Sequence, residues 1–161
     1  LEMVLRSTAG NERFSVDAAE VEAAAPSYTV HTLQRLRGEL GPGQPLVLLD
    51  GADAFAGLAT WYHWRDLFAL AHIAVSHRPG FPVEAAGLPH ELATEFGDRR
   101  LPGASGLRET PAGGIVTFAM TQLAISATQI RKLLAAGESA RYLLPDSVLD
   151  YIRTHSLYRN P

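Results

Sequence analysis

Residues 45–53 read Pro-Leu-Val-Leu-Leu-Asp-Gly-Ala-Asp, and this stretch decides the fold class. The four residues after Pro45 are all apolar, which is typical of a parallel strand buried on both faces. Residues 73–75 and, apart from Thr117, residues 115–119 are apolar as well. We therefore expect buried strands at all three places.

Helical patterns alternate with these strands. Residues 27–40 carry apolar side chains at helical spacing, with Ser27 as a candidate N-cap and Gly41 as the stop. Further helices are expected at 1–9, 53–57, 62–70, 90–96, 126–136 and 146–155, with a short strand at 14–16. This alternation predicts an α/β fold, a Rossmann-like open and mostly parallel sheet with helices on both faces.

Length and composition favour a single domain over residues 1–161, with a Pro- and Gly-rich long loop region at 79–112. Hydrophobic residues make up 47% of the chain and charged ones 19%, so the chain is not wholly disordered. The lack of cysteine excludes disulfide frameworks, zinc ribbons and thiol nucleophiles.

Charge and hydropathy bear on the partners. The net charge is −3 and neither half is strongly basic, which argues against nucleic-acid binding. The uncharged stretch at 112–130 is rich in Gly, Thr, Ser and Gln and too polar for a membrane span. We expect no membrane partner and a cytoplasmic location.

A candidate anion site begins the helix at 126–136, where residues 125–131 read Ile-Ser-Ala-Thr-Gln-Ile-Arg. The free backbone N–H groups of a helix start, two hydroxyls from Ser126 and Thr128, and Arg131 one turn in could hold phosphate oxygens. The alternative needs no ligand, because Ser126 and Gln129 have the spacing of a capping box.

Two more candidates follow predicted strands, at the edge where open parallel sheets bind ligands. Gly51 allows close backbone approach, and Asp53 could meet ribose hydroxyls or a metal-bound phosphate, or could simply cap the next helix. Pro79 keeps Arg78 extended, where it could grip phosphate or stay a solvated surface arginine. Asp50 is unusual because a carboxylate ends an otherwise buried run.

Residues 60–64 read Thr-Trp-Tyr-His-Trp and could stack on a flat ligand. Core packing of at least two of the three aromatic rings is the favoured alternative. No histidine pair has i,i+4 spacing, so we assign no metal cluster and no Ser–His–Asp set.

Together these segments resemble the bacterial nicotinate-mononucleotide adenylyltransferases of the nucleotidyltransferase superfamily. The resemblance extends over essentially the whole chain and rests on the segments 26–29 (Pro-Ser-Tyr-Thr), 51–53, 60–62, 78–80, 125–131 and 144–159. It implies a transferase of NAD biosynthesis, in which the phosphate of nicotinate mononucleotide attacks the α-phosphate of ATP. The products are deamido-NAD and pyrophosphate, and Mg²⁺ assists through the ATP phosphates.

The resemblance also implies roles for single residues. Those on the ATP side would be Gly51, Asp53, Ser126, Thr128 and Arg131. Those on the mononucleotide side would be Tyr28, Thr29, Trp61, Tyr62 and Arg78, with Trp61 against the nicotinate ring and backbone N–H groups on its carboxylate.

The sequence departs from the family pattern at the start. The family opens with a strand and a Gly-Gly-Thr-Phe-Asp-Pro-x-His-x-Gly-His loop whose histidines stabilise the reacting phosphates, and no such loop occurs here. We therefore expect an N-terminal βα portion of roughly 30–60 residues to be missing, and we assign no catalytic residue. Asp50 also replaces a residue that is usually aliphatic.

Two alternatives stay open. The chain could be another adenylyltransferase of the superfamily, acting on phosphopantetheine or nicotinamide mononucleotide. It could also be a catalytically dead nucleotide-binding fragment.

Overall fold

The computed structural model describes residues 1–121, 123 and 125–158. The chain forms two compact units, one of Ala25–Gln122 and one of Leu1–Ala24 with Leu123–Pro161.

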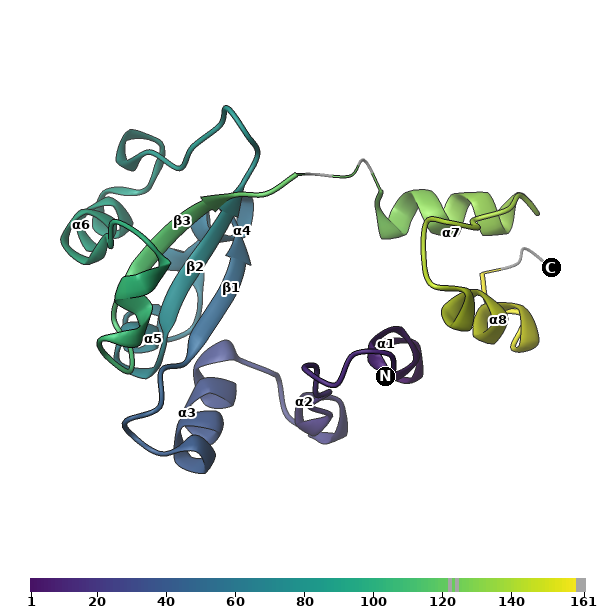
Figure 1. Cartoon of the computed structure of the whole chain (residues 1–161), viewed down its shortest axis with the longest axis horizontal. Coiled ribbons are helices and arrows are strands. Elements are labelled where there is room, and N and C mark those ends of the chain that lie inside the picture. The colour runs from purple at the N-terminus through teal and green to yellow at the C-terminus, as the bar shows by residue number, and fades with distance from the viewer. Residues whose placement is uncertain (122, 124, 159–161) are drawn as a thin grey trace. The chain divides into compact units, whose positions relative to one another are not determined.

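The larger unit holds a parallel sheet of β1 (Val47–Gly51), β2 (His72–His77) and β3 (Ile115–Ala119), in that spatial order (Figure 1). Leu49 is paired with Ala74, and Ala74 with Val116. The α/β class and the parallel strands are thus confirmed. Because the strands run in one direction, their carboxyl ends meet at one edge of the sheet.

The helices of this unit are α3 (Thr29–Leu40), α4 (Ala52–Ala56), α5 (Leu67–Leu70) and α6 (His90–Arg99). Short 3₁₀ turns lie at Leu58–Thr60, Trp64–Asp66, Ala85–Gly87 and Ala104–Arg108. Apolar side chains of the four helices and of the turns at Leu58–Thr60 and Trp64–Asp66 pack with Ile73, Val75 and Ile115 of the sheet into one core. Within it the Phe55 and Phe96 rings, from α4 and α6, lie 5.9 Å apart.

Several helix bounds differ from the sequence prediction. The N-cap of α3 is Tyr28 rather than Ser27, while Gly41 ends the helix in the left-handed region at φ 85° as expected. The single helix expected at 62–70 is a 3₁₀ turn followed by α5, because His63 adopts a left-handed conformation with φ 51°. The loop region at 79–112 contains all of α6.

The expectation that residues 46–49 are buried on both faces is wrong, because Leu46, Val47 and Leu48 are only partly buried and the Leu49 side chain is 72% exposed. β1 pairs with β2 alone among the described strands, so it lies at the edge of the sheet. An apolar run in the sequence indicates that a strand can be buried. The elements that pack against the strand decide which of its side chains are covered.

Arg37, near the end of α3, joins four backbone segments. Its Nε donates to the Leu70 carbonyl at 3.1 Å, Nη1 donates to Gly41 O at 3.2 Å, and Nη2 donates to Pro111 O at 2.8 Å. Nη1 also donates to Gln44 O. One guanidinium thus satisfies carbonyls that α3, α5 and two loops leave without helical partners.

His72 lies fully buried at the start of β2. Its Nδ1 accepts a hydrogen bond from the Gly114 N–H at 2.8 Å, and its Nε2 lies 2.7 Å from the Thr110 carbonyl. Because Nδ1 is an acceptor, the ring proton is on Nε2 and is donated to Thr110. The ring therefore ties the loop before β3 to β2.

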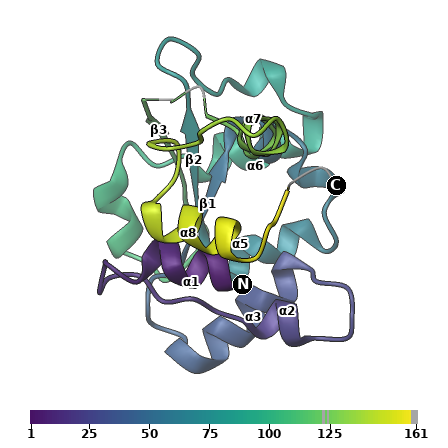
Figure 2. The same ribbon diagram turned by 90° about the vertical axis from the view of Figure 1, so that its right-hand side faces the viewer.

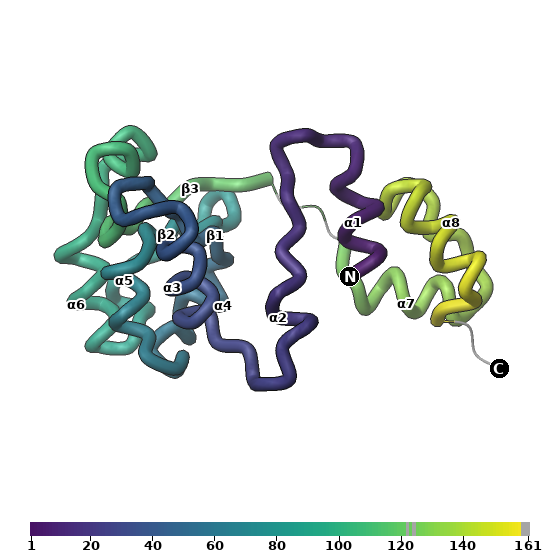
Figure 3. Tube along the Cα trace, turned by 90° about the horizontal axis from the view of Figure 1, so that it is seen from below, coloured from purple at the N-terminus to yellow at the C-terminus, as the bar shows by residue number. Residues whose placement is uncertain are grey.

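The smaller unit contains α1 (Glu2–Thr8), α2 (Ala19–Glu22), α7 (Ala127–Ala135) and α8 (Asp146–Thr154). α1 lies beside α8 (Figures 2 and 3). The Ser147 hydroxyl donates to Arg6 O at 3.1 Å, and the Arg6 guanidinium lies 5.0 Å from the Tyr151 ring centroid.

The strand expected at 14–16 is wrong, because these residues form no strand. Phe14 N donates instead to Asn11 O in a turn, and the Phe14 side chain is exposed. A three-residue strand needs a neighbouring strand to accept its hydrogen bonds, and this segment pairs with none of the described ones. No described helix is both long and apolar enough to cross a bilayer.

Candidate functional site

Gly51, Asp53 and Arg78 line one cavity of about 550 Å³ at the carboxyl ends of β1 and β2. Ser76, His77 and Phe81 complete much of its wall. Gly51 is paired with Ser76 in the sheet, so the two strands deliver their following loops to the same place. The structure thus brings together three of the predicted site residues that are far apart in the sequence.

Asp53 does not cap α4. The N-cap of that helix is Gly51, in an extended conformation, and Asp53 lies exposed in the first turn. A carboxylate in the first helical turn is favourably placed against the helix dipole. Its oxygens remain accessible to a ligand in the cavity, which disfavours the capping alternative.

Asp50 directly precedes Gly51 of this cavity in the sequence, and its side chain is half-buried. Its Oδ1 accepts a hydrogen bond from Gly51 N at 2.8 Å, whereas its Oδ2 is buried without a hydrogen-bond partner among the described residues. Burial raises the pKa of this carboxyl above its ordinary value, and the Gly51 N–H opposes the shift. The Ser76 hydroxyl donates to the backbone carbonyl of Asp50 at 3.1 Å.

Tyr28 and Tyr62 contact each other, with ring centroids 4.6 Å apart. His31 lies 5.7 Å from the Tyr28 ring and 5.8 Å from the Tyr62 ring. His63 approaches the Tyr62 ring at 4.3 Å and is held by Asp66, whose Oδ2 lies 3.0 Å from Nδ1. These four rings form an exposed cluster where α3 begins.

The other members of the aromatic segment belong to the core. Trp64 is buried, and Trp61 is partly buried against the core cluster. Two of the three rings therefore pack in the interior, which confirms the favoured alternative. Thr29 is the first residue of α3 and directly follows Tyr28.

Sequence reasoning missed His31 and His63. The sequence did indicate the proximity of His31 to Tyr28, because His31 lies three residues after Tyr28 and so shares its helical face. The contact between residues 28–31 and 62–63 needed the tertiary structure.

The helix start at 126–136 lies in the smaller unit. Ser126 is the N-cap of α7, and its hydroxyl oxygen accepts a hydrogen bond from Gln129 N at 3.1 Å, one half of the capping-box alternative. Ser126 and Thr128 line a cavity of about 490 Å³, together with Lys132. Arg131 is exposed and does not line this cavity, so Lys132 is the cationic residue that the sequence analysis missed there.

Residues 1–121, 123 and 125–158 hold no group of three or more His, Asp or Glu side chains that could ligate a metal ion. A metal at this site would need ligands from a substrate.

No family model matches the chain. It is 78% identical over 160 residues to a probable nicotinate-nucleotide adenylyltransferase of Dechloromonas aromatica, covering 99% of this chain and 74% of that protein. A protein of the same description from Pseudomonas putida strain W619 is 47% identical over 161 residues, which are 72% of its length.

Solved structures agree in fold. A Plasmodium falciparum nicotinic acid mononucleotide adenylyltransferase complexed with APC superposes with a TM-score of 0.54 at 15% identity, over 84% of this chain and 60% of that one. Its complex with NaAD gives the same TM-score over 58% of that chain.

The parallel sheet, with its cavity at the carboxyl edge and this structural likeness, defines an α/β protein of the nucleotidyltransferase fold. The 78% sequence identity to the Dechloromonas aromatica protein, over almost the entire chain, then identifies the family within this fold class. The chain belongs to the nicotinate-nucleotide adenylyltransferase family.

Proposed function

We propose that this protein transfers the adenylyl group of ATP to nicotinate mononucleotide, giving deamido-NAD and pyrophosphate. The observation that carries the proposal beyond family membership is the shared cavity of Gly51, Asp53 and Arg78. We also propose that the reaction takes place in the cytoplasm, where ATP is abundant.

The chemistry needs no protein nucleophile. A phosphate oxygen of the mononucleotide attacks the α-phosphorus of ATP, and the bond from that phosphorus to the oxygen bridging to the β-phosphate breaks. Pyrophosphate leaves with the bonding electron pair. The protein has to align the two substrates and neutralise charge on the phosphates.

On the nucleotide side, Gly51 lines the cavity without a side chain, so its backbone can lie close to the ligand. The Asp53 carboxylate accepts hydrogen bonds from ribose hydroxyls. The Arg78 guanidinium, across the same cavity, binds phosphate on the mononucleotide side with two parallel N–H donors.

In the smaller unit, the Ser126 and Thr128 hydroxyls and Arg131 bind phosphate oxygens of ATP. The free N–H groups at the start of α7 reinforce this. Lys132, which lines the same cavity as the two hydroxyls, adds a further positive charge.

On the mononucleotide side, we assign the nicotinate to Tyr28, Thr29, Trp61 and Tyr62. Tyr28 and Tyr62 are exposed rings in contact with each other, so they can offer an aromatic surface to a pyridine. Backbone N–H groups near Trp61 donate hydrogen bonds to the carboxylate of that ring.

Mg²⁺ fits this arrangement as a companion of ATP. It is usually bound by one or two carboxylates plus substrate phosphates, and the accessible Asp53 in the cavity supplies such a carboxylate. When bound, the ion would neutralise negative charge on the phosphates.

Release of pyrophosphate by the protein tests the proposal. With ATP, we expect release that depends on nicotinate mononucleotide and is much slower with the amide mononucleotide. Equal rates with both, or release independent of either, would contradict the assignment of the acceptor. Calorimetric ATP binding without turnover would instead support a nucleotide-binding module.

A further inference from the structure

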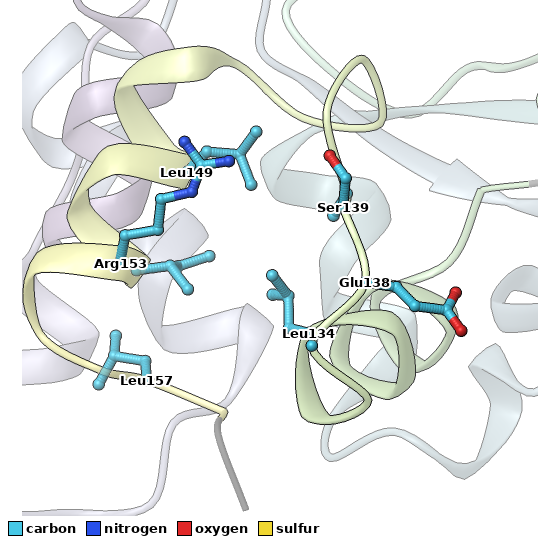
Figure 4. A pocket seen from close by; sticks show the side chains of 9 residues that line it. Leu134, Glu138, Ser139, Leu149, Arg153 and Leu157 are labelled. Carbon is cyan, nitrogen blue, oxygen red and sulfur yellow. The ribbon is translucent and has the colours of Figure 1, made fainter.

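A cavity of about 210 Å³ lies between α7 and α8, within the smaller unit and apart from the residues proposed for the reaction (Figure 4). Its apolar wall comes from both helices and the segment after α8: Leu134, Leu149, Ile152 and Leu157. Its polar wall includes Ser139 and Arg153. The cavity thus joins an apolar body to a cationic group.

The guanidinium of Arg153 is only weakly engaged within the described chain. Its Nη1 lies 3.7 Å from Asp150 Oδ1, well beyond the ~2.7–2.9 Å of a charge-assisted hydrogen bond. Arg153 and Asp150 are both largely exposed, so this pair adds little to stability. The five N–H donors of the guanidinium are therefore available to a carboxylate.

Ser139 adds a second donor. Its Oγ already accepts a hydrogen bond from Arg141 N at 3.3 Å, which leaves the hydroxyl proton to donate. Figure 4 shows the carboxylate of Glu138 directed away from Arg153 and Leu157, so it does not compete for the guanidinium.

The apolar part sets the size of the ligand. An apolar cavity of about 150 Å³ is enough to hold benzene, and this one is larger. Leu157 lies on the side of the cavity away from Ser139, and Leu134 of α7 lies between them (Figure 4), so an apolar ring has leucine side chains to pack against.

We propose that the cavity between α7 and α8 binds a small monocarboxylate with a single apolar ring, of the size of benzoate. The carboxylate contacts Arg153 and Ser139, and the ring lies against Leu134, Leu149 and Leu157. This site is separate from the proposed reaction and does not depend on it.

The first test titrates the ¹⁵N-labelled protein with benzoate and, as the matched neutral probe, with benzamide. Benzoate is expected to give saturable amide shifts concentrated at residues 134–140 and 149–157, while benzamide binds at least about tenfold more weakly because it cannot pair with the guanidinium. Equal affinities, or shifts concentrated elsewhere, would overturn the proposal.

Three surface variants sharpen the test. Arg153→Gln is expected to weaken benzoate binding about tenfold, whereas Arg13→Gln, an exposed arginine of the same unit outside the cavity wall, leaves it unchanged. Asp150→Asn should strengthen binding, because it removes the carboxylate that competes for Arg153. Unchanged affinity in Arg153→Gln, or weaker binding in Asp150→Asn, would refute the assigned contacts.

Discussion

Asp53 and Arg78 belong to different strand ends yet face one cavity, which makes them the most informative single side chains for the proposed reaction. In the proposed reaction both act through charge, and both side chains are exposed at the cavity rather than packed in the core. Their substitution therefore separates function from folding better than that of Trp61, which packs against the core.

We expect Asp53→Asn and Arg78→Gln each to lower kcat/KM by about ten- to a hundredfold, the range for losing a hydrogen bond to a charged group. The melting temperature should change little because both positions are accessible. Asp98→Asn and Arg108→Gln, exposed residues outside this cavity, serve as matched controls. Activity within twofold of the parent in either cavity variant would remove that residue from the site.

Asp50 predicts a pH dependence of stability. Its pKa is raised in the folded state by burial, so the folded protein holds this proton at pH values where the unfolded chain has lost it. The contribution of the Asp50 carboxyl to the free energy of unfolding is therefore highest at acid pH. It falls as the pH rises through the raised pKa and is constant above it.

Asp50→Leu should consequently raise the free energy of unfolding at pH 7 by about 1 kcal/mol, with a smaller gain near pH 4. Urea titrations at both pH values, with Asp98→Leu as the exposed control, measure the difference. A gain that is the same at both pH values would show that packing, not ionisation, is responsible.

Gly114 precedes β3 and has no room for a side chain. A Cβ there would contact the Leu101 side chain and lie 2.9 Å from His72 Nδ1, the atom that accepts the Gly114 N–H. We expect Gly114→Ala to cost about 2 kcal/mol of unfolding free energy. Gly97→Ala, in an open position of α6, should instead be neutral or slightly stabilising; similar effects at both positions would contradict the steric argument.

At the scale of elements, Arg37 holds the end of α3 against the end of α5 and the loop at Pro111. Arg37→Lys keeps the charge but loses the planar fork of donors, so several carbonyls lose their partner. We expect a loss of about 2–3 kcal/mol in chemical denaturation. Gln34→Ala, on the exposed side of the same helix, should cost far less, and a comparable cost would mean that α3 itself is the sensitive element.

The sequence predicted most elements because helix and strand periodicity are local. α3, α6, α7 and α8 and all three strands were expected within a few residues of their bounds. The failures were short segments: the strand at 14–16 lacked a pairing partner, and the helix at 62–70 was interrupted at His63. In both, a tertiary contact or an unusual dihedral angle outweighed the local pattern.

At the scale of the whole molecule, the prediction of one domain over residues 1–161 stays a prediction. The smaller unit buries few apolar side chains, mainly Ala140, Val148, Leu149 and Ile152. So small a core gives little stability on its own. We therefore expect a single calorimetric transition whose van't Hoff and calorimetric enthalpies agree; two separated transitions would mean two independent domains.

The sequence by itself determined the fold class and the family resemblance, because continuous apolar strands, helix stops and ordered motifs are written in consecutive residues. It also placed Gly51, Asp53 and Arg78 after strands, and the shared edge of a parallel sheet follows from strand direction. Only the tertiary structure decided that Leu49 is exposed and that Tyr28 and His31 of α3 meet Tyr62. Those outcomes depend on which surfaces meet across long stretches of chain, and no local pattern encodes that.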